Sequence, residues 1–336
     1  MQFDYLHRRK FITLFSGGVV IWTVAAHAQQ SERARLIGVL MGYAESDPDA
    51  QANVSAFRES LQKLGWSEGH NIRIDTRWPI PADVESLQRF AKELVALQPD
   101  VILSHITPTT AALLQQTRTI PIIFATVSDP VGSGFVASFP RPGGNVTGFT
   151  SIEPTMGGKW VELLKEIAPG IARVALLFNP VTAPYAEYFL EPLKAAAPSL
   201  GVKVIAAPVR DTSELEAVVA AQAREPNSGL IVTPDSFMDV HRAEATSLAA
   251  QYRLPAIYPF HQFPEVGGLL SYGNDQLDNY RRAAVYVDRI LRGAKPSELP
   301  VQAPVKFELV INLKTAKALG LDVPAQLQQR ADQVIE

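Results

Sequence analysis

Short apolar runs of strand length alternate with longer amphipathic segments along most of this sequence. The run 36–41 is followed by Val54, Phe57 and Leu61 at helical spacing, and a later run, 120–124, follows another helical segment. Strands that alternate with helices form parallel sheets with helices on both faces. The alternation therefore predicts a doubly wound, Rossmann-like α/β fold.

Four landmarks of this pattern occur a second time in the same order. The paired segments are 36–41 with 173–178, the strand ending at 107–108 with 229–234, 120–124 with 254–258, and 143–148 with 267–272. A chain of 336 residues also exceeds the span that one hydrophobic core usually serves. We therefore expect two α/β lobes joined by a hinge; chance similarity between common strand sequences is the alternative.

The landmarks also give the lobe boundaries. We expect residues 29–150 to form the N-terminal lobe, with 273–298 returning to it, and residues 151–272 to form the C-terminal lobe. Residues 299–336 are expected to pack on the C-terminal lobe, although the pattern itself leaves their lobe open. The pattern predicts that a helix at 315–319 closes the chain.

Residues 1–28 have the composition of a signal peptide. A basic run at 8–10 precedes the apolar stretch 11–26, and Ala26-His27-Ala28 has the small-x-small pattern that signal peptidase cleaves. The apolar stretch has about 16 residues, whereas a membrane span needs about 20. We expect cleavage near Ala28 and Gln29 and a periplasmic protein without stable membrane insertion; a retained anchor is the alternative.

The paired arginines at the start of that segment also fit a twin-arginine signal. Export by that route and export by the general secretory route both remain open.

Charge and cysteine content restrict the classes of partner. Without residues 1–28 the formal net charge is 28 − 33 = −5, and no run of lysine and arginine lies beyond them. Because nucleic-acid binding needs clustered cations, nucleic acid is not an expected partner. The absence of cysteine removes thiolate catalysis, disulfides and a lipid-modified cysteine anchor.

Motifs of enzymes and cofactors are missing. Gly157-Gly158-Lys159 lacks the upstream glycine of a phosphate loop, and neither a His-Glu-x-x-His motif nor a dinucleotide turn occurs. Gly132-Ser133-Gly134 lacks the register of a nucleophile elbow. We therefore expect a binding protein rather than an enzyme, with no cofactor and no metal. A two-lobed transferase or epimerase, or an effector-sensing domain, is the alternative.

Candidate ligand contacts follow strands of the N-terminal lobe, because ligands of open α/β sheets bind beyond the carboxyl ends of the strands. The backbone of Gly42 could approach a ligand closely and Tyr43 offers a stacking face, although a surface loop explains both equally well. Other candidates are polar. Thr107 and Thr109 lie at a helix start and could bind a carboxylate, and Ser128 could donate to an anion. Asp129 could accept from an ammonium group, with capping of the following turn as the alternative.

The C-terminal lobe offers corresponding positions. Asn179 follows its first strand, and Asp235 follows the strand opposite the Thr107 loop. Asp235 is the candidate ammonium partner, with helix capping as the alternative. Tyr258 and Tyr272 are candidates for an aromatic wall around an apolar part of the ligand, and packing in the core or hinge is the alternative.

Several of these segments resemble a known family. The run Val127-Ser128-Asp129-Pro130-Val131-Gly132, the run 141–148 (Arg-Pro-Gly-Gly-Asn-Val-Thr-Gly) and the run 313–320 (Leu-Lys-Thr-Ala-Lys-Ala-Leu-Gly) are similar to those of ABC-transporter substrate-binding proteins of the TrpX type. The resemblance spans roughly residues 35–335. It implies a type I periplasmic-binding architecture with a hinge of three crossovers, and delivery of the ligand to ABC permease subunits with a cytoplasmic ATPase.

The ligand expected from these observations is a small molecule held in the interlobe cleft. An amino acid fits, and the family resemblance adds aromatic amino acids as candidates. Its carboxylate would lie at residues 107–110 and Ser128, its ammonium group near Asp235, and its side chain near Tyr43, Tyr258 or Tyr272. We expect the protein to be a monomer that does not transform this ligand.

Overall fold

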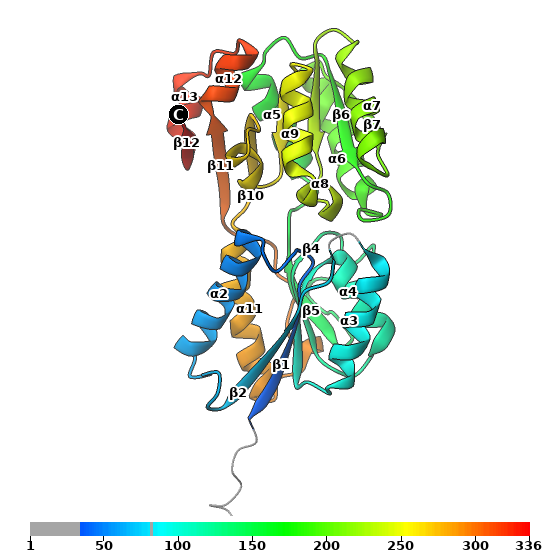
Figure 1. The fold of residues 1–336 in the computed structure, drawn as a ribbon, viewed down its shortest axis with the longest axis vertical. Coiled ribbons are helices and arrows are strands. Elements are labelled where there is room, and N and C mark those ends of the chain that lie inside the picture. Colours follow the sequence, from blue (N-terminus) through cyan, green and yellow to red (C-terminus); the bar gives the residue numbers. More distant parts are fainter. Residues whose placement is uncertain (1–33, 81–82) are drawn as a thin grey trace, which may run out of the picture.

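The computed structural model describes residues 34–80 and 83–336, so the expected signal peptide and its cleavage site lie outside the described residues. The described chain forms two α/β lobes that lie one above the other and are joined by three crossovers (Figure 1). Among the described residues, no helix has the length and apolarity needed to cross a membrane.

The first lobe, the lower one in Figure 1, contains a parallel five-stranded sheet of order β2-β1-β3-β4-β5. Its strands are β1 (Arg35–Leu40), β2 (Ile72–Arg77), β3 (Val101–Ile106), β4 (Ile122–Val127) and β5 (Val146–Thr150). Its helices are α2 (Pro48–Lys63), α3 (Val84–Ala96), α4 (Thr107–Gln116) and α11 (Gln276–Leu291). Helices α2 and α11 cover one face of this sheet, and α3 and α4 cover the other.

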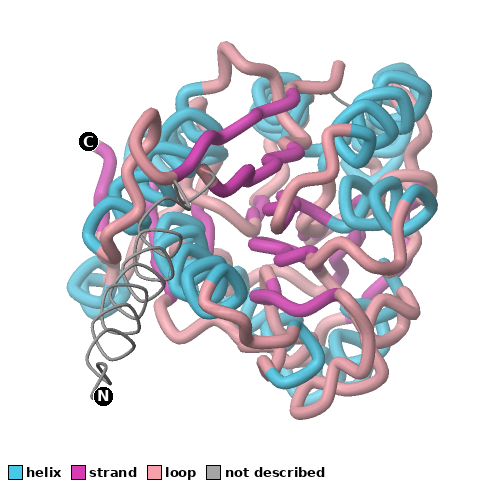
Figure 2. Tube along the Cα trace, turned by 90° about the horizontal axis from the view of Figure 1, so that it is seen from below, coloured by secondary structure: helices cyan, strands magenta, loops and turns pink. Residues whose placement is uncertain are grey.

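The second lobe contains a seven-stranded sheet of order β12-β11-β10-β9-β8-β6-β7, in which only β10 and β11 pair antiparallel. Its strands are β6 (Arg173–Phe178), β7 (Lys203–Pro208), β8 (Ser228–Val232), β9 (Ala256–Tyr258), β10 (Leu270–Asn274), β11 (Phe307–Asn312) and β12 (Gln333–Ile335). Its α-helices are α5 (Met156–Ile167), α6 (Ala186–Ala196), α7 (Thr212–Ala223), α8 (Ser236–Val240), α9 (Arg242–Gln251), α10 (Gln262–Glu265), α12 (Leu313–Leu319) and α13 (Ala325–Arg330). Figure 2 shows the strands in the middle with helices around them.

The doubly wound two-lobed fold predicted from the sequence is confirmed. Strands β7-β6-β8-β9-β10 follow the same order as β2-β1-β3-β4-β5, so the duplicated landmarks occupy corresponding places in the two sheets. Most strands are buried on both faces, which explains why their sequences are continuous apolar runs rather than alternating ones. Each lobe therefore directs the carboxyl ends of its parallel strands toward the gap between the lobes (Figure 1).

The end of the chain differs in detail from the sequence-based boundaries. Residues 273–274 complete β10 in the second sheet, and residues 299–302 still lie along the first lobe. Val301 donates its backbone N–H to the carbonyl of Phe139, and Gln302 donates to that of Gly148, because β5 leaves a free edge for an extended segment. The helix 313–319 does not close the chain, since α13 and β12 follow it.

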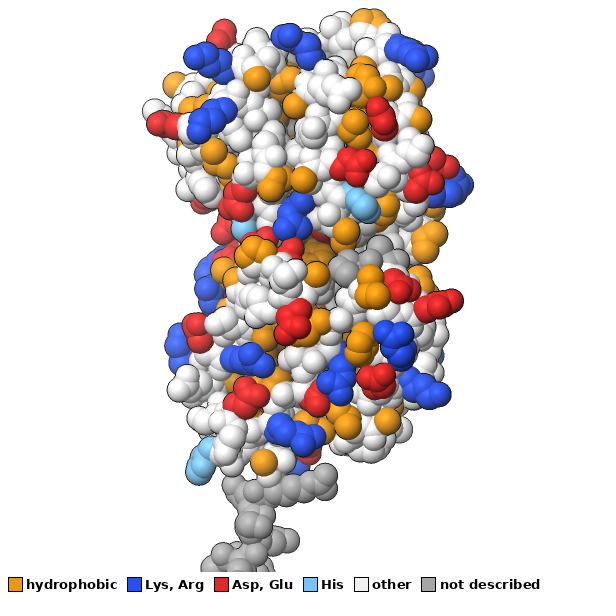
Figure 3. All heavy atoms as spheres, in the orientation of Figure 1, with side chains coloured by type: hydrophobic (Ala, Val, Ile, Leu, Met, Phe, Trp, Pro, Cys, Tyr) orange, Lys and Arg blue, Asp and Glu red, His pale blue; other side chains and the backbone are white. Residues whose placement is uncertain are grey.

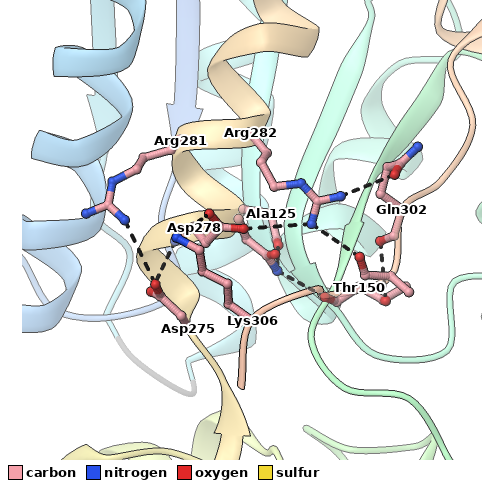
Figure 4. A network of polar contacts seen from close by, with 10 residues as sticks. Ala125, Thr150, Asp275, Asp278, Arg281, Arg282, Gln302 and Lys306 are labelled. Carbon is pink, nitrogen blue, oxygen red and sulfur yellow. Dashed lines mark hydrogen bonds and ion pairs between the residues drawn. The ribbon is translucent and has the colours of Figure 1, made fainter. Parts of the chain in front are cut away.

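The start of α11 joins the three crossovers (Figure 4). The buried amide of Asn279 donates to the carbonyls of Ala125 and Thr150, at 2.9 and 3.0 Å. Arg282 donates to the carbonyl of Ala303 and to the side chain of Gln302, both at 3.2 Å. These contacts place the ends of β4 and β5, the start of α11 and the last crossover in one polar network at the hinge.

Candidate functional site

Two adjoining pockets lie between the lobes, beyond the carboxyl ends of the strands. We call the first the polar pocket; it includes Tyr43, Ser128, Ser151, Asp235, Asp239 and Gln276. We call the second the apolar pocket; it includes Ile80, Leu87, Ile106, Pro108 and Val181. The two spaces, about 310 and 420 Å³ with some open solvent included, share Ile106, Pro108 and Ser236. The two pockets therefore adjoin each other, and Figure 3 shows a groove at this level of the molecule.

One hydrogen bond crosses the polar pocket from lobe to lobe. Tyr43 follows β1 and donates its hydroxyl to Asp239 Oδ2 of α8 at 2.6 Å. Arg242 forms a second interlobe contact, an ion pair with Asp47 Oδ2 at 2.9 Å. Both contacts join the segment 43–47 to the segment 239–242. The lobes are therefore closed upon each other at this end of the site.

Asp239 is a buried carboxyl group with a raised pKa. Burial raises its pKa to about 8, although the hydrogen bond from Tyr43 opposes this shift. Within residues 34–80 and 83–336, only the Tyr43 hydroxyl donates to its carboxyl group. Burial and the neighbouring Asp239 charge in turn raise the pKa of Tyr43. Asp239 is thus a buried acid that retains capacity for a cationic partner.

Asp235 has a different environment. Its carboxyl group accepts from the Thr182 hydroxyl and from the backbone N–H groups of Asn179 and Phe237, the latter two at 2.6 and 2.9 Å. The bond from Phe237 caps α8. Burial raises the pKa of Asp235 to about 6, against the opposing effect of these hydrogen bonds. The carboxyl group lines the polar pocket, but donors of its own lobe already occupy it, as the capping alternative requires.

The hydroxyl groups at the start of α4 are largely used within the first lobe. Thr109 bonds to both the carbonyl and the N–H group of Ile106, and to Ser104. Thr107 accepts from the backbone N–H of Ser128 at 3.2 Å. The hydroxyls of Ser128 and Ser151 lie 3.0 Å apart and line the polar pocket. Together they offer donors on the first-lobe side of the site.

Gly42 allows the first strand to end close to β3. Its N–H group donates to His105 Nδ1 at 3.2 Å, and a Cβ atom at this position would lie 2.4 Å from Ile106 Cδ1. Burial lowers the pKa of His105 to about 3, so the ring stays neutral and can accept this bond. The ring also contacts Tyr43 edge to face, with centroids 4.5 Å apart. Gly42 and His105 therefore hold Tyr43 at the site.

The structure brings together only part of the predicted site. Tyr43, Ser128 and Asp235 line the polar pocket, and Gly42 and Thr109 line the apolar pocket. Thr107 and Asn179 lie directly behind these residues. The side chain of Asn179 accepts from the N–H groups of Val181 and Thr182, and thus shapes the loop after β6.

Three predicted residues lie apart from the pockets. Asp129 accepts from the N–H of Gly132 at 2.7 Å, which is the turn-capping alternative. Tyr258 stacks on Phe263 in the core, with centroids 4.8 Å apart, and Tyr272 stacks on Phe307 beside the crossover. Neither ring is among the residues that line the two pockets, and these contacts favour the alternative of core and hinge packing.

The sequence analysis missed Asp239, Ser151 and Gln276. Asp239 lies four residues after Asp235, one helical turn along, and this spacing was an available signal. Ser151 and Gln276 lie at crossovers, where no periodic pattern identifies the direction of a side chain. Among the described residues no cluster of acidic or histidine side chains could hold a metal ion.

Known proteins resemble this chain over most of its length. The family model for ABC transporter substrate binding protein matches residues 43–335. The tyrosine-binding protein of Clostridioides difficile (strain R20291) is 26% identical over 277 residues, which are 82% of this chain and 78% of that protein.

Two solved structures are similar to both lobes. The ABC domain of Streptococcus pneumoniae in complex with L-Trp superposes with a TM-score of 0.82 and 27% identity, covering 90% of this chain and 99% of that one. A conserved domain protein of Vibrio cholerae gives a TM-score of 0.82 and 28% identity, covering 90% and 100% of the two chains. The expected family and fold are thereby confirmed.

Proposed function

The chain belongs to the ABC transporter substrate-binding protein family, and from this premise we propose that it binds an amino acid between its lobes and delivers it to an ABC permease. Capture would take place in the periplasm, after removal of residues 1–28. The observation that carries the proposal is the cleft itself, in which a buried acid of one lobe faces hydroxyl groups of the other. Relatives that bind tyrosine and tryptophan support an amino acid as the ligand.

The ammonium group of the ligand is assigned to Asp239. This carboxyl group lines the polar pocket, and Tyr43 is its one donor among the described residues. A buried carboxylate is strongly stabilised by a cationic partner, which lowers its pKa. Asp239 thus replaces Asp235, whose oxygens are occupied, as the proposed ammonium partner.

The carboxylate of the ligand is assigned to the first-lobe side of the polar pocket. Ser128 and Ser151 present hydroxyl donors there, and α4 begins beside them with the positive end of its dipole. The proposed pose spans both lobes, so binding favours the closed arrangement by contacts that the open one lacks.

The test is titration of the processed protein, residues 29–336, against amino acids, purines and small organic acids. An amino acid at a hundred times its Kd should stabilise the fold by about 2.7 kcal/mol in thermal unfolding. If every amino acid leaves the midpoint unchanged, the ligand proposal is wrong.

Two further measurements separate binding from chemistry and delivery. Recovery of the bound amino acid unchanged after long incubation supports a carrier, whereas turnover of excess ligand to product contradicts it. Uptake of the same amino acid should depend on this protein in cells that also contain its permease and ATPase; uptake that is unaffected by its loss contradicts delivery.

A further inference from the structure

The apolar pocket continues the polar pocket at one end. Ile106 and Pro108 line both, and they stand between the Asp239 side of the site and a space bounded by Leu87 of α3 and Val181 of the second lobe. A ligand anchored by charged groups in the polar pocket would therefore place its remaining part against these aliphatic side chains. Both lobes contribute to this wall, so it is complete only when the cleft is closed.

Several polar side chains of the apolar pocket form hydrogen bonds within the protein. The Asp83 carboxylate accepts from the N–H groups of Glu85 and Ser86 as the cap of α3. The Thr182 hydroxyl donates to Asp235, and Thr109 bonds to Ile106. Among the described lining residues none is aromatic. The pocket therefore offers mainly apolar contact to a ligand side chain.

Described apolar residues at this end of the site are exposed. Val181 is 65% exposed, and Ile80 and Val84 are 61% and 54% exposed, although all three line the pocket. Aliphatic side chains this exposed on both sides of a cleft leave apolar area that a bound molecule can cover. A longer ligand side chain would bury more of this apolar area.

We propose that the apolar pocket selects amino acids with extended apolar side chains, with neither an aromatic ring nor a distal polar group required. This inference rests on the proposed function and assigns specificity within the same site. Each methylene that the ligand side chain buries in the pocket contributes about 0.8 kcal/mol. Each added methylene should therefore increase the affinity about fourfold. A hydroxyl at the end of the side chain should weaken binding only modestly, since apolar pockets reject such groups weakly.

The experiment measures Kd calorimetrically for 2-aminobutyrate, norvaline, norleucine and 2-aminooctanoate, and for the pair phenylalanine and tyrosine. The processed wild type is compared with Val181→Ser and with Val305→Ser, a matched control because Val305 is 68% exposed and lies outside both pockets. We expect affinity to rise by about fourfold per methylene in the wild type and in Val305→Ser. The rise should be clearly smaller in Val181→Ser.

The outcomes separate this inference from the proposed function. If amino acids bind but affinity is independent of chain length, or if Val181→Ser retains the full rise, the inference is overturned and the proposed function stands. Tyrosine binding more than a hundredfold tighter than phenylalanine would also overturn it, because such a difference needs a dedicated polar partner. If no amino acid binds, both fail.

Discussion

The hydroxyl of Tyr43 lies 2.6 Å from Asp239 Oδ2, and this hydrogen bond joins the two lobes across the polar pocket. Both side chains are buried, so the bond forms where water is largely excluded. Such a bond is stronger than one on the surface, and its loss leaves a carboxyl group without its donor. Together with the ion pair between Arg242 and Asp47, it holds the lobes in the closed arrangement.

Tyr43→Phe should therefore weaken ligand binding by about ten- to a hundredfold, as expected for loss of about 1.5–3 kcal/mol at a bond to an acidic group. Calorimetric titration measures the effect, and small-angle scattering should show a larger fraction of open molecules. Tyr188→Phe serves as the control, because the Tyr188 ring packs on Phe189 within the second lobe and lines neither pocket. Equal affinities for Tyr43→Phe and wild type would show that the bond does not support closure.

Ligand binding should release a proton from Asp239. In the free protein its pKa of about 8 leaves it mostly protonated at pH 7, and an ammonium group beside it would lower that pKa. Affinity should therefore increase from pH 6 to pH 8, by up to about tenfold per pH unit. Titrations in buffers of different ionisation enthalpy count the protons.

Asp239→Asn should abolish both the proton release and the pH dependence. The same titrations on Asp211→Asn, a change at an exposed helix cap of the second lobe, should retain both. Proton release that persists in Asp239→Asn would assign the ammonium site to another acid.

The stability of the free protein should change with pH in the opposite direction. Because the pKa of Asp239 rises from about 3.9 in the unfolded chain to about 8 on folding, the folded state binds one more proton between these values. This contribution to stability is present in full below about pH 3.9 and is lost as the pH rises toward 8, by at most about 1.4 kcal/mol per unit. The raised pKa of Asp235 likewise lowers the stability as the pH rises, until the pH reaches its pKa of about 6. Urea unfolding from pH 5 to pH 8 should show a flatter profile for Asp239→Asn; an unchanged profile would contradict the raised pKa.

Gly42→Ala should disturb the site through its neighbours. The new Cβ would lie 2.4 Å from Ile106 Cδ1 and 2.7 Å from Cγ1, so Ile106 must move within the wall shared by both pockets. Such overpacking costs about 1–3 kcal/mol, measurable by denaturant unfolding, and should also weaken ligand binding. Gly144→Ala is the control, since a Cβ there would meet no described atom within 4 Å. Wild-type affinity in Gly42→Ala would show that Ile106 adapts freely.

The fold could be predicted from the sequence because parallel strands that are buried on both faces consist of continuous apolar runs. The runs of β1 and β4 recur in β6 and β9. It also located the site at the strand ends, since the topology alone brings these ends together. Gly42, Tyr43 and Asp235 were found in this way.

Side-chain direction at a strand end was beyond such reasoning. Tyr258 ends β9 and Tyr272 lies within β10. Both rings stack on phenylalanines of other segments, Phe263 and Phe307, and neither lines a pocket. Asp239 lies one helical turn after Asp235, but α8 has only five residues, so no apolar period shows which of its side chains enters the cleft. Its role depends on Tyr43, which is 196 residues earlier in the chain.

Helix α11 belongs to the first lobe but follows β6 to β10 of the second lobe in the sequence. Its Tyr280 and Val287 are fully buried against α2 and the first sheet. Synthesis proceeds at about 5–20 residues per second. Residues 35–150 are therefore made well before α11, and the hydrophobic core of the first lobe is incomplete until this helix is available. Both lobes therefore stay unfinished until the last part of the chain has been synthesised, because α11 completes the first lobe and the later strands β11 and β12 complete the sheet of the second.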